Sequence, residues 1–144
     1  MAAGAVERCG GPGAAAYVRP MSAARQALGE VGERVAERWL RRQGWRVLDR
    51  RFRSGHRDLD LVVAREGVVA FVEVKARRRL VGGDPVEAVG WRKQRELIRS
   101  ALVWISRRGR PGSAYRFDVI GVLVGGRRVR VRHVENAFFA RSLP

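Results

Sequence analysis

Two neighbouring stretches of the chain restrict its fold more than any other feature. Asp58 to Ala64 and Val68 to Ala76 are both rich in apolar and β-branched residues, and Arg65-Glu66-Gly67 lies between them. Extended segments joined by a short glycine-containing turn are typical of a β-hairpin. The sequence therefore predicts a hairpin whose turn is centred between Glu66 and Gly67.

Four charged residues interrupt this otherwise apolar hairpin. With the turn at that position, Asp60 lies opposite Glu73 and Asp58 lies opposite Lys75. Directly opposed residues share a face, as do residues two apart on one strand. The hairpin is therefore expected to carry three acids and one ammonium group on one face. The intervening side chains would point into the core: Leu59, Leu61, Val72 and Val74.

The rest of the chain alternates between helical and extended patterns. The apolar positions of residues 24–43 recur at three- and four-residue spacing, which indicates an amphipathic helix that ends at Gly44. The element order α-β-β-β-α-β-β predicts an α/β fold, a single sheet with helices packed against it. A second helix is expected over 84–108, and further strands are expected over 45–52, 115–124 and 129–134.

Local signals place the boundaries of these elements. Asp84 has the character of a helix N-cap and is followed by Pro85 and, at the third helical position, Glu87. Gly125-Gly126 predicts a second hairpin turn. The arginines of 45–52 suggest an exposed edge strand, the apolar stretch 115–124 suggests an internal strand, and alternating arginines mark one solvated face of 129–134.

The chain is expected to hold one folded domain. Residues 1–23 mix Gly, Ala and Pro without periodicity and predict a disordered extension, with Met21 as an alternative start of translation; the folded domain spans 24–144. Cys9 is the single cysteine and cannot form an internal disulfide, and no apolar run approaches the roughly 18–20 residues of a membrane span. These features favour a cytoplasmic protein.

The charge of the chain points to a polyanionic partner. Thirty basic residues against fourteen acidic ones give a net charge of +16, and nucleic acid is the commonest partner of such a field. Arginine that merely covers the surface is the alternative. Only two of the basic residues are lysines, Lys75 and Lys93. A lysine in so arginine-rich a chain suggests a position that needs a compact ammonium group.

The acids of the hairpin predict a metal site. Opposed carboxylates such as Asp60 and Glu73 repel each other and destabilise an antiparallel pair, so a compensating cation is expected. Mg²⁺ or Mn²⁺ would take oxygen ligands here and activate water against a phosphodiester, and Lys75 would stabilise the developing charge. The alternative from spacing alone is that Lys75 bridges Asp58 or Glu73 on a solvated sheet face.

Several motifs in order resemble a known family. Asp60, followed thirteen residues later by Glu73-Val74-Lys75, resembles the PD-(D/E)xK nuclease motif. Together with Gly29-Glu30-Val31-Gly32-Glu33 and Arg116-Phe117-Asp118-Val119, it resembles the YraN family over about residues 28–120. That family consists of small bacterial proteins of the restriction-endonuclease-like fold, similar to archaeal Holliday-junction resolvases.

The resemblance implies a fold and a set of roles. The fold would be an α-β-β-β-α-β core with a mixed central sheet flanked by helices. Asp60 and Glu73 would be metal ligands, Lys75 the catalytic lysine and Glu33 an additional acid from the first helix. The activity would be Mg²⁺- or Mn²⁺-dependent cleavage of DNA, branched or otherwise structured, by a homodimer. The chain departs from the family at Arg57-Asp58, where Gly-Glu is usual, which leaves the role of Asp58 open.

Other residues receive less specific expectations. The best candidates for contacts with nucleic acid are Arg77, Arg78, Arg79 and Lys93. Asp118 is expected to be the buried partner of an arginine, and His133 to lie on the surface. The tryptophans are expected to pack in the core and not to form a stacking platform. The alternative function is a non-catalytic nucleic-acid-binding protein that retains the nuclease fold.

Overall fold

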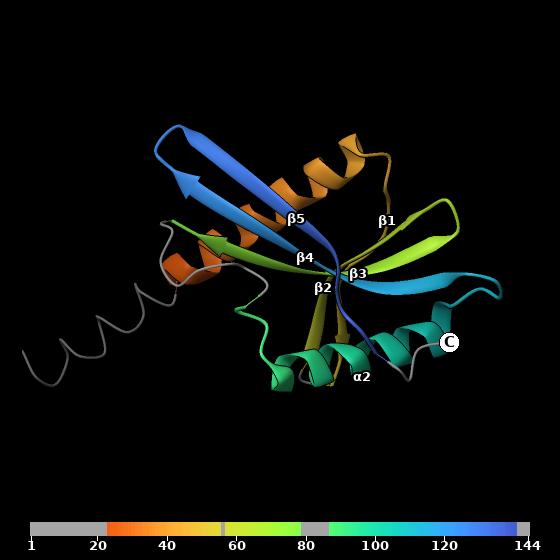
Figure 1. Cartoon of the computed structure of the whole chain (residues 1–144). Helices are drawn as coiled ribbons and strands as arrows, with labels where there is room; N and C mark the ends of the chain where they lie inside the picture. Colours follow the sequence, from red (N-terminus) through yellow and green to blue (C-terminus); the bar gives the residue numbers. More distant parts are fainter. Residues whose placement is uncertain (1–22, 56, 79–86, 141–144) are drawn as a thin grey trace, which may run out of the picture.

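The structure of the protein is a computed structural model that describes residues 23–55, 57–78 and 87–140. Residues 1–22 of the expected N-terminal extension lie outside this description. An N-terminal helix over residues 23–42 is followed by β1 (Arg46–Ser54), β2 (Arg57–Arg65) and β3 (Val68–Arg77). Helix α2 (Trp91–Arg108), β4 (Ala114–Gly125) and β5 (Arg128–Phe138) complete the chain (Figure 1). The predicted α/β element order is confirmed.

The strands form one mixed five-stranded sheet in the order β1-β2-β3-β4-β5. Strands β3 and β4 are parallel, and the other neighbours are antiparallel. The predicted turn between β2 and β3 is confirmed, because Glu66 and Gly67 both have positive φ angles, of 50° and 78°, as a tight two-residue hairpin turn requires. As expected, β1 is an edge strand and β4 is internal.

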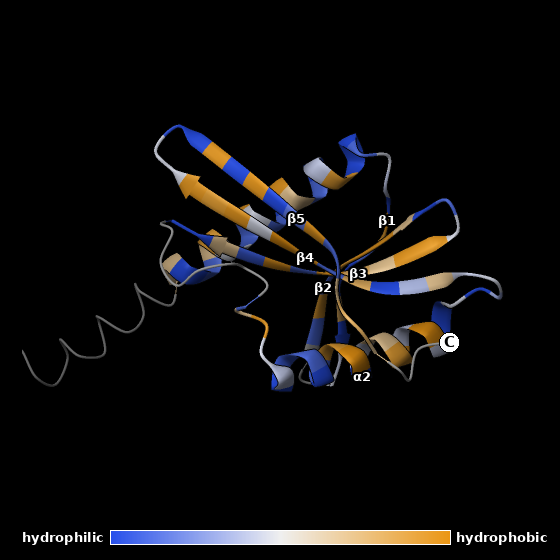
Figure 2. Ribbon diagram, in the orientation of Figure 1, coloured by the Kyte–Doolittle hydropathy of each residue, from blue (hydrophilic) through white to orange (hydrophobic). Residues whose placement is uncertain are grey.

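The two helices cover opposite faces of the sheet (Figure 1). Helix 23–42 packs Ala36 and Leu40 against one face, over a core that includes Val72 and Ile120. Helix α2 packs Leu97, Ala101 and Trp104 against the other face, over Phe71 and Phe117. Figure 2 shows apolar and polar residues alternating along β5, the pattern of a strand with one solvated face. No described helix is both long and apolar enough to cross a membrane.

Helix α2 begins later than the sequence suggests. The predicted N-cap Asp84 and Pro85 lie outside the described residues. Glu87 and Ala88 form a turn, and α2 begins at Trp91 after Gly90, whose backbone is extended (φ −68°, ψ 168°). The second hairpin turn also lies one residue later than predicted, at Gly126 and Arg127. The apolar spacing predicts a longer helix because Val89, which is 3% exposed, is buried although it precedes α2.

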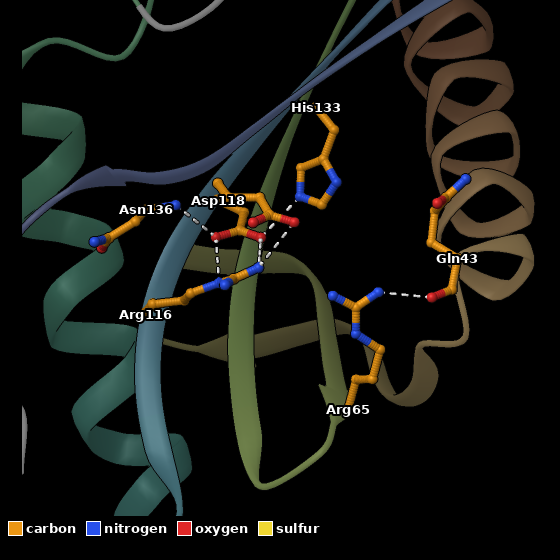
Figure 3. A network of polar contacts seen from close by, with 7 residues as sticks. Gln43, Arg65, Arg116, Asp118, His133 and Asn136 are labelled. Carbon is orange, nitrogen blue, oxygen red and sulfur yellow. Dashed lines mark hydrogen bonds and ion pairs between the residues drawn. The ribbon is translucent and has the colours of Figure 1, made fainter.

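A buried carboxylate secures β5 to β4 (Figure 3). Asp118 accepts hydrogen bonds from Arg116 and from the backbone N–H of Asn136, and it contacts His133 Nε2 at 2.8 Å. The prediction that Asp118 pairs with an arginine is confirmed. The surface placement of His133 was wrong, because the regular pair Ile120↔His133 puts this histidine on the buried face of the sheet beside Asp118.

Several donors act on Asp118 together. Burial alone would raise the pKa of the Asp118 carboxyl, but the hydrogen bonds from His133, Asn136 and Arg116 outweigh burial and hold that pKa below its usual range. A carboxylate that is buried but fully paired fixes the geometry around it. Asp118 therefore acts as a structural anchor of the sheet.

One glycine sets the distance between helix 23–42 and the sheet. A Cβ atom placed on Gly32 would lie 2.5 Å from the Cβ of Ala76, closer than two carbon atoms can approach without displacement. Only a residue without a side chain allows this contact. Because Ala76 directly follows Lys75 on β3, the same contact brings the neighbouring Glu33 towards the end of the hairpin.

Replacing Gly32 by alanine should therefore destabilise the protein. We expect Gly32→Ala to lower the free energy of unfolding by about 1–2 kcal/mol, since overpacking costs more than the helix propensity of alanine returns. Gly29 is the matched control because no atom lies within 4 Å of a Cβ built there, so Gly29→Ala should raise stability by up to about 1 kcal/mol. Urea unfolding of both variants makes the comparison. Equal effects would contradict the close contact.

Candidate active site

Glu73 is the buried centre of the candidate site. It lies on β3, and its side chain is 6% exposed. Lys75 Nζ lies 3.3 Å from Glu73 Oε1, and Lys93 Nζ, from α2, lies 3.7 Å from the same oxygen. The only two lysines of the chain therefore meet at one carboxylate. The predicted proximity of Lys75 to Glu73 is confirmed. The ion pair between Lys93 and Glu73 was not predicted, and contact of Lys93 with nucleic acid stays a prediction.

The second oxygen of Glu73 has no such partner. Oε2 is buried, and no donor among the described residues lies within hydrogen-bonding distance of it. A buried carboxylate oxygen without a partner is costly, so most buried polar atoms acquire one. This oxygen is thus available to a ligand outside the described protein atoms.

Asp60 lies beside Glu73 by a different contact from the one predicted. The β2–β3 ladder runs from Arg65↔Val68 to Leu61↔Val72. Beyond it, Asp60 Oδ2 accepts a hydrogen bond of 2.8 Å from the backbone N–H of Val74. The carboxylate takes the place of a backbone acceptor and so ends the ladder while keeping the acid against β3. Asp60 and Glu73 are brought together as the sequence predicts.

The environment of Asp60 disfavours its charge. Burial raises the pKa of the Asp60 carboxyl, and the negative charge of Glu73 raises it further. The hydrogen bond from Val74 opposes this rise and the charge of Glu33 adds to it, and the resulting pKa is about 7. Two neighbouring acids that repel each other in a buried position are the arrangement that a bound cation would relieve.

Asp58 does not take the predicted position opposite Lys75. The β2–β3 ladder ends at Leu61 and does not reach Asp58. Strand β2 remains paired with β1 there, and Asp58 is the partner of Arg53. Arg53 Nε lies 3.4 Å from Asp58 Oδ1, and both side chains are exposed. Leu59 likewise joins the core under α2 and not the core under helix 23–42. Both differences lie in the part of β2 that precedes Leu61, which is not paired with β3.

Glu33 reaches the edge of the site but is held by an arginine. Arg51 Nε lies 2.8 Å from Glu33 Oε2. Arg51 lies between the pairs Arg50↔Leu61 and Phe52↔Leu59, and therefore faces Asp60, with a positive φ of 45° that is uncommon for a non-glycine residue. A cavity of about 410 Å³ adjoins this group and is lined by Glu30, Glu33, Arg34, Glu37, Arg50, Arg51 and Leu61.

The carboxylate oxygens of Asp60 and Glu73 fit a hard divalent cation that takes few protein ligands. Within the described ranges, no three Asp, Glu, His or Cys side chains come together closely enough to form a complete metal site. Mg²⁺ is typically held by one or two carboxylates, with water and substrate phosphate as its other ligands. Asp60 and Glu73, with the unpartnered Oε2, meet that requirement. The raised pKa of Asp60 and the buried oxygen of Glu73 are the two observations that support this fit.

The basic residues after β3 are placed only in part. Arg77 ends β3, and Arg78 follows it as an exposed residue. Arg79 lies outside the described residues. Arg77 and Arg78 therefore continue the strand that carries Glu73 and Lys75, and their predicted contacts with nucleic acid stay a prediction.

A cavity larger than the one beside Glu33 lies at the other end of the hairpin. It has a volume of about 820 Å³ and contains the turn residues Glu66 and Gly67. Asp60 lies six positions before Glu66 in the sequence, a distance of roughly 20 Å at 3.3 Å per residue. Its arginines are Arg46, Arg65, Arg108 and Arg110. Cavity size therefore does not identify the acidic site, which is distinguished by burial and charge.

The repulsion between the acids should make stability depend on pH. The folded-state pKa of the Asp60 carboxyl is raised, so the fold is more stable with this carboxyl protonated. This contribution to the free energy of unfolding is fully present below pH 3.8 and is lost as pH rises through about 7. Asp60→Asn, which keeps an acceptor for Val74, should match the wild type near pH 4. It should be more stable by roughly 2–4 kcal/mol at pH 8.

Urea unfolding in EDTA at both pH values measures this difference. Asp58→Asn removes the same charge from an exposed ion pair and serves as the control. A gain at pH 8 that is equal in both variants, or absent in Asp60→Asn, would contradict the proposed repulsion.

Comparisons with known proteins place the chain in a family. The model of the uncharacterised protein family UPF0102 matches residues 32–122. A UPF0102 protein of Trichlorobacter lovleyi is 45% identical over 115 residues, which cover 78% of this chain and 91% of the relative. A UPF0102 protein of Myxococcus xanthus is 40% identical over 122 residues, which cover 85% and 97%.

A third relative, a UPF0102 protein of Rhodococcus jostii, is 42% identical over 113 residues, which cover 78% of this chain and 96% of the relative. The matched range contains Glu33, Asp60, Glu73, Lys75 and Lys93. The predicted family, YraN, is therefore confirmed, and the chain belongs to the UPF0102 family.

Proposed function

We propose that this chain is a metal-dependent endonuclease of the restriction-endonuclease-like fold that hydrolyses phosphodiester bonds in DNA, with branched or otherwise structured DNA as its preferred substrate. The observation that carries the proposal is the meeting of Asp60, Glu73 and Lys75 at the end of the β2–β3 hairpin, with one buried oxygen of Glu73 left unpartnered. The net charge of +16 supports a polyanionic substrate.

Each residue has a distinct role in this proposal. Asp60 and Glu73 would hold Mg²⁺ or Mn²⁺, which when bound would supply charge neutralisation at the phosphate and activation of water. Lys75 would donate hydrogen bonds to the phosphate oxygens as negative charge develops. Lys93 would hold Glu73 in place from α2, and Glu33 would join the site when Arg51 moves away from it.

The arginines that follow Lys75 would contact the backbone of the substrate. Arg77 and Arg78 continue β3 beyond Lys75, so a phosphate bound near Glu73 has basic residues next to it along the strand. Contacts of this kind read no sequence, and the proposed selectivity is for structure. Two strands of a symmetric junction require two sites, and we therefore propose that the protein acts as a homodimer.

One observation favours a second function, a non-catalytic nucleic-acid-binding protein. Two ammonium groups already lie near Glu73 Oε1, and two lysines can neutralise a carboxylate without a metal ion. Under this alternative, the acidic cluster stabilises the fold and the arginines alone contact nucleic acid.

Cleavage of labelled linear, flapped and four-way DNA with Mg²⁺ or Mn²⁺ tests the proposal. We expect Glu73→Gln and Lys75→Met to lower the cleavage rate by about 100-fold or more, because each removes charge from the reacting centre. Binding measured in EDTA should persist in both. Glu66→Gln, which makes the same change in the exposed turn at the far end of the hairpin, should cleave normally. Binding without cleavage by the wild type with either metal would favour the second function.

A further inference from the structure

Trp91 is exposed, unlike the other tryptophans. Its side chain is 61% exposed, whereas Trp45 and Trp104 are 3% exposed and Trp39 is half-buried. The expectation that all tryptophans pack in the core is therefore wrong for Trp91. The reason is the position of the helix start, because Trp91 is the first residue of α2 and precedes the buried stripe that begins at Leu97. Single exposed apolar residues are common, so exposure alone points to no ligand.

The surroundings of Trp91 make it more than an isolated exposed ring. The guanidinium carbons of Arg92 and Arg95 lie 5.3 and 5.9 Å from the centre of a Trp91 ring, within the range of cation–π attraction. The first turn of α2 contains no acidic residue. The indole of Trp91 and the two guanidinium groups thus form one positively charged surface of flat side chains, which we term the Trp91 platform.

The Trp91 platform shares the first turn of α2 with Lys93, which reaches the candidate site. Lys93 lies two residues after Trp91 on the same turn of α2, and its ammonium group lies 3.7 Å from Glu73 Oε1. A nucleic-acid strand that places a phosphate at Glu73 and passes around the first turn of α2 would therefore meet the platform. An aromatic ring beside arginines is the surface on which unpaired bases stack, with the phosphate backbone neutralised at its side.

We propose that the Trp91 platform stacks an unpaired base of the substrate, a few nucleotides from the phosphate that lies at Glu73. The ligand class is a nucleic acid with unstacked bases, such as a flap, an overhang or a branch point, and not an uninterrupted duplex, whose bases expose no face. This inference rests on the proposed function for the role of Glu73 and names the substrate class of that site.

The geometry of the helix sets the spacing between base and phosphate. Residues two apart on a helix leave it in nearly opposite directions, so Trp91 and Lys93 are separated by the width of α2. A helix with its side chains is about 10–12 Å wide, and successive nucleotides are about 3.4 Å apart along a stacked strand. The stacked base should therefore lie about three nucleotides from the phosphate at Glu73.

Binding in EDTA tests the platform independently of cleavage. The probes are a blunt duplex and the same duplex with a single-stranded overhang, each labelled for fluorescence anisotropy. We expect Trp91→Ala to weaken binding of the overhang probe by roughly 5- to 150-fold, the loss that follows from removal of one stacked base. Binding of the blunt duplex should change less than twofold. Trp91→Phe should restore most of the affinity.

Controls separate stacking from general loss of an apolar residue. Phe139 is 81% exposed on the segment after β5, and Phe139→Ala should leave both probes bound as in the wild type. Quenching of tryptophan fluorescence by the overhang probe should be lost in Trp91→Phe although binding persists. Equal weakening of both probes, or no weakening of either, would overturn the proposal. In the second case, Trp91 would be assigned to contact with another protein.

The outcome is distinguishable from failure of the proposed function. If the wild type cleaves no DNA while Trp91→Ala still loses the overhang selectively, the platform stands and the nuclease assignment fails. If cleavage depends on Glu73 while Trp91→Ala binds and cuts every probe as the wild type does, the nuclease assignment stands and the platform is overturned.

Discussion

The parallel pairing of β3 with β4 is the constraint on which the rest of the structure depends. Ten residue pairs join the two strands, from Val68↔Ala114 to Arg77↔Leu123. Parallel neighbours cannot be joined by a tight turn and need a crossover across a face of the sheet. Helix α2 is that crossover. Its return across the face that carries Glu73 places Lys93 on this carboxylate, so the candidate site requires both the β2–β3 hairpin and the pairing with β4.

Local patterns predict the parts of the fold that local contacts determine. The alternation of apolar residues and the Glu66-Gly67 turn are sufficient to predict the β2–β3 hairpin and the proximity of Asp60 to Glu73. Asp118 in an apolar strand is likewise sufficient to predict a buried ion pair. Each of these predictions depends on neighbours that lie along one strand or across one hairpin.

The differences come from competition and from distant contacts. Asp60 ends the ladder because its carboxylate competes for the N–H of Val74, which no pairing rule includes. The position of Lys93 depends on a crossover that joins residues far apart in sequence. His133 faces inward because it pairs with the buried Ile120 of β4, and Trp91 is exposed because α2 begins seven residues after Asp84. A periodic pattern detects which residues are apolar, but not where the helix that carries them begins.

The arginines at the two edges of the sheet have a consequence for self-association. Arg46, Arg50 and Arg53 are exposed along β1, and Arg128 and Arg130 are exposed along β5. Unpaired strand edges invite the edge of another molecule, and rows of like charge oppose that contact. Two copies of this sheet would repel most at the β5 margin in water of low salt, because Arg50 and Arg53 of β1 are paired with Glu37 and Asp58. The same rows would be neutralised along a polyanion, so repulsion between free copies and attraction to a polyanion would have one electrostatic origin.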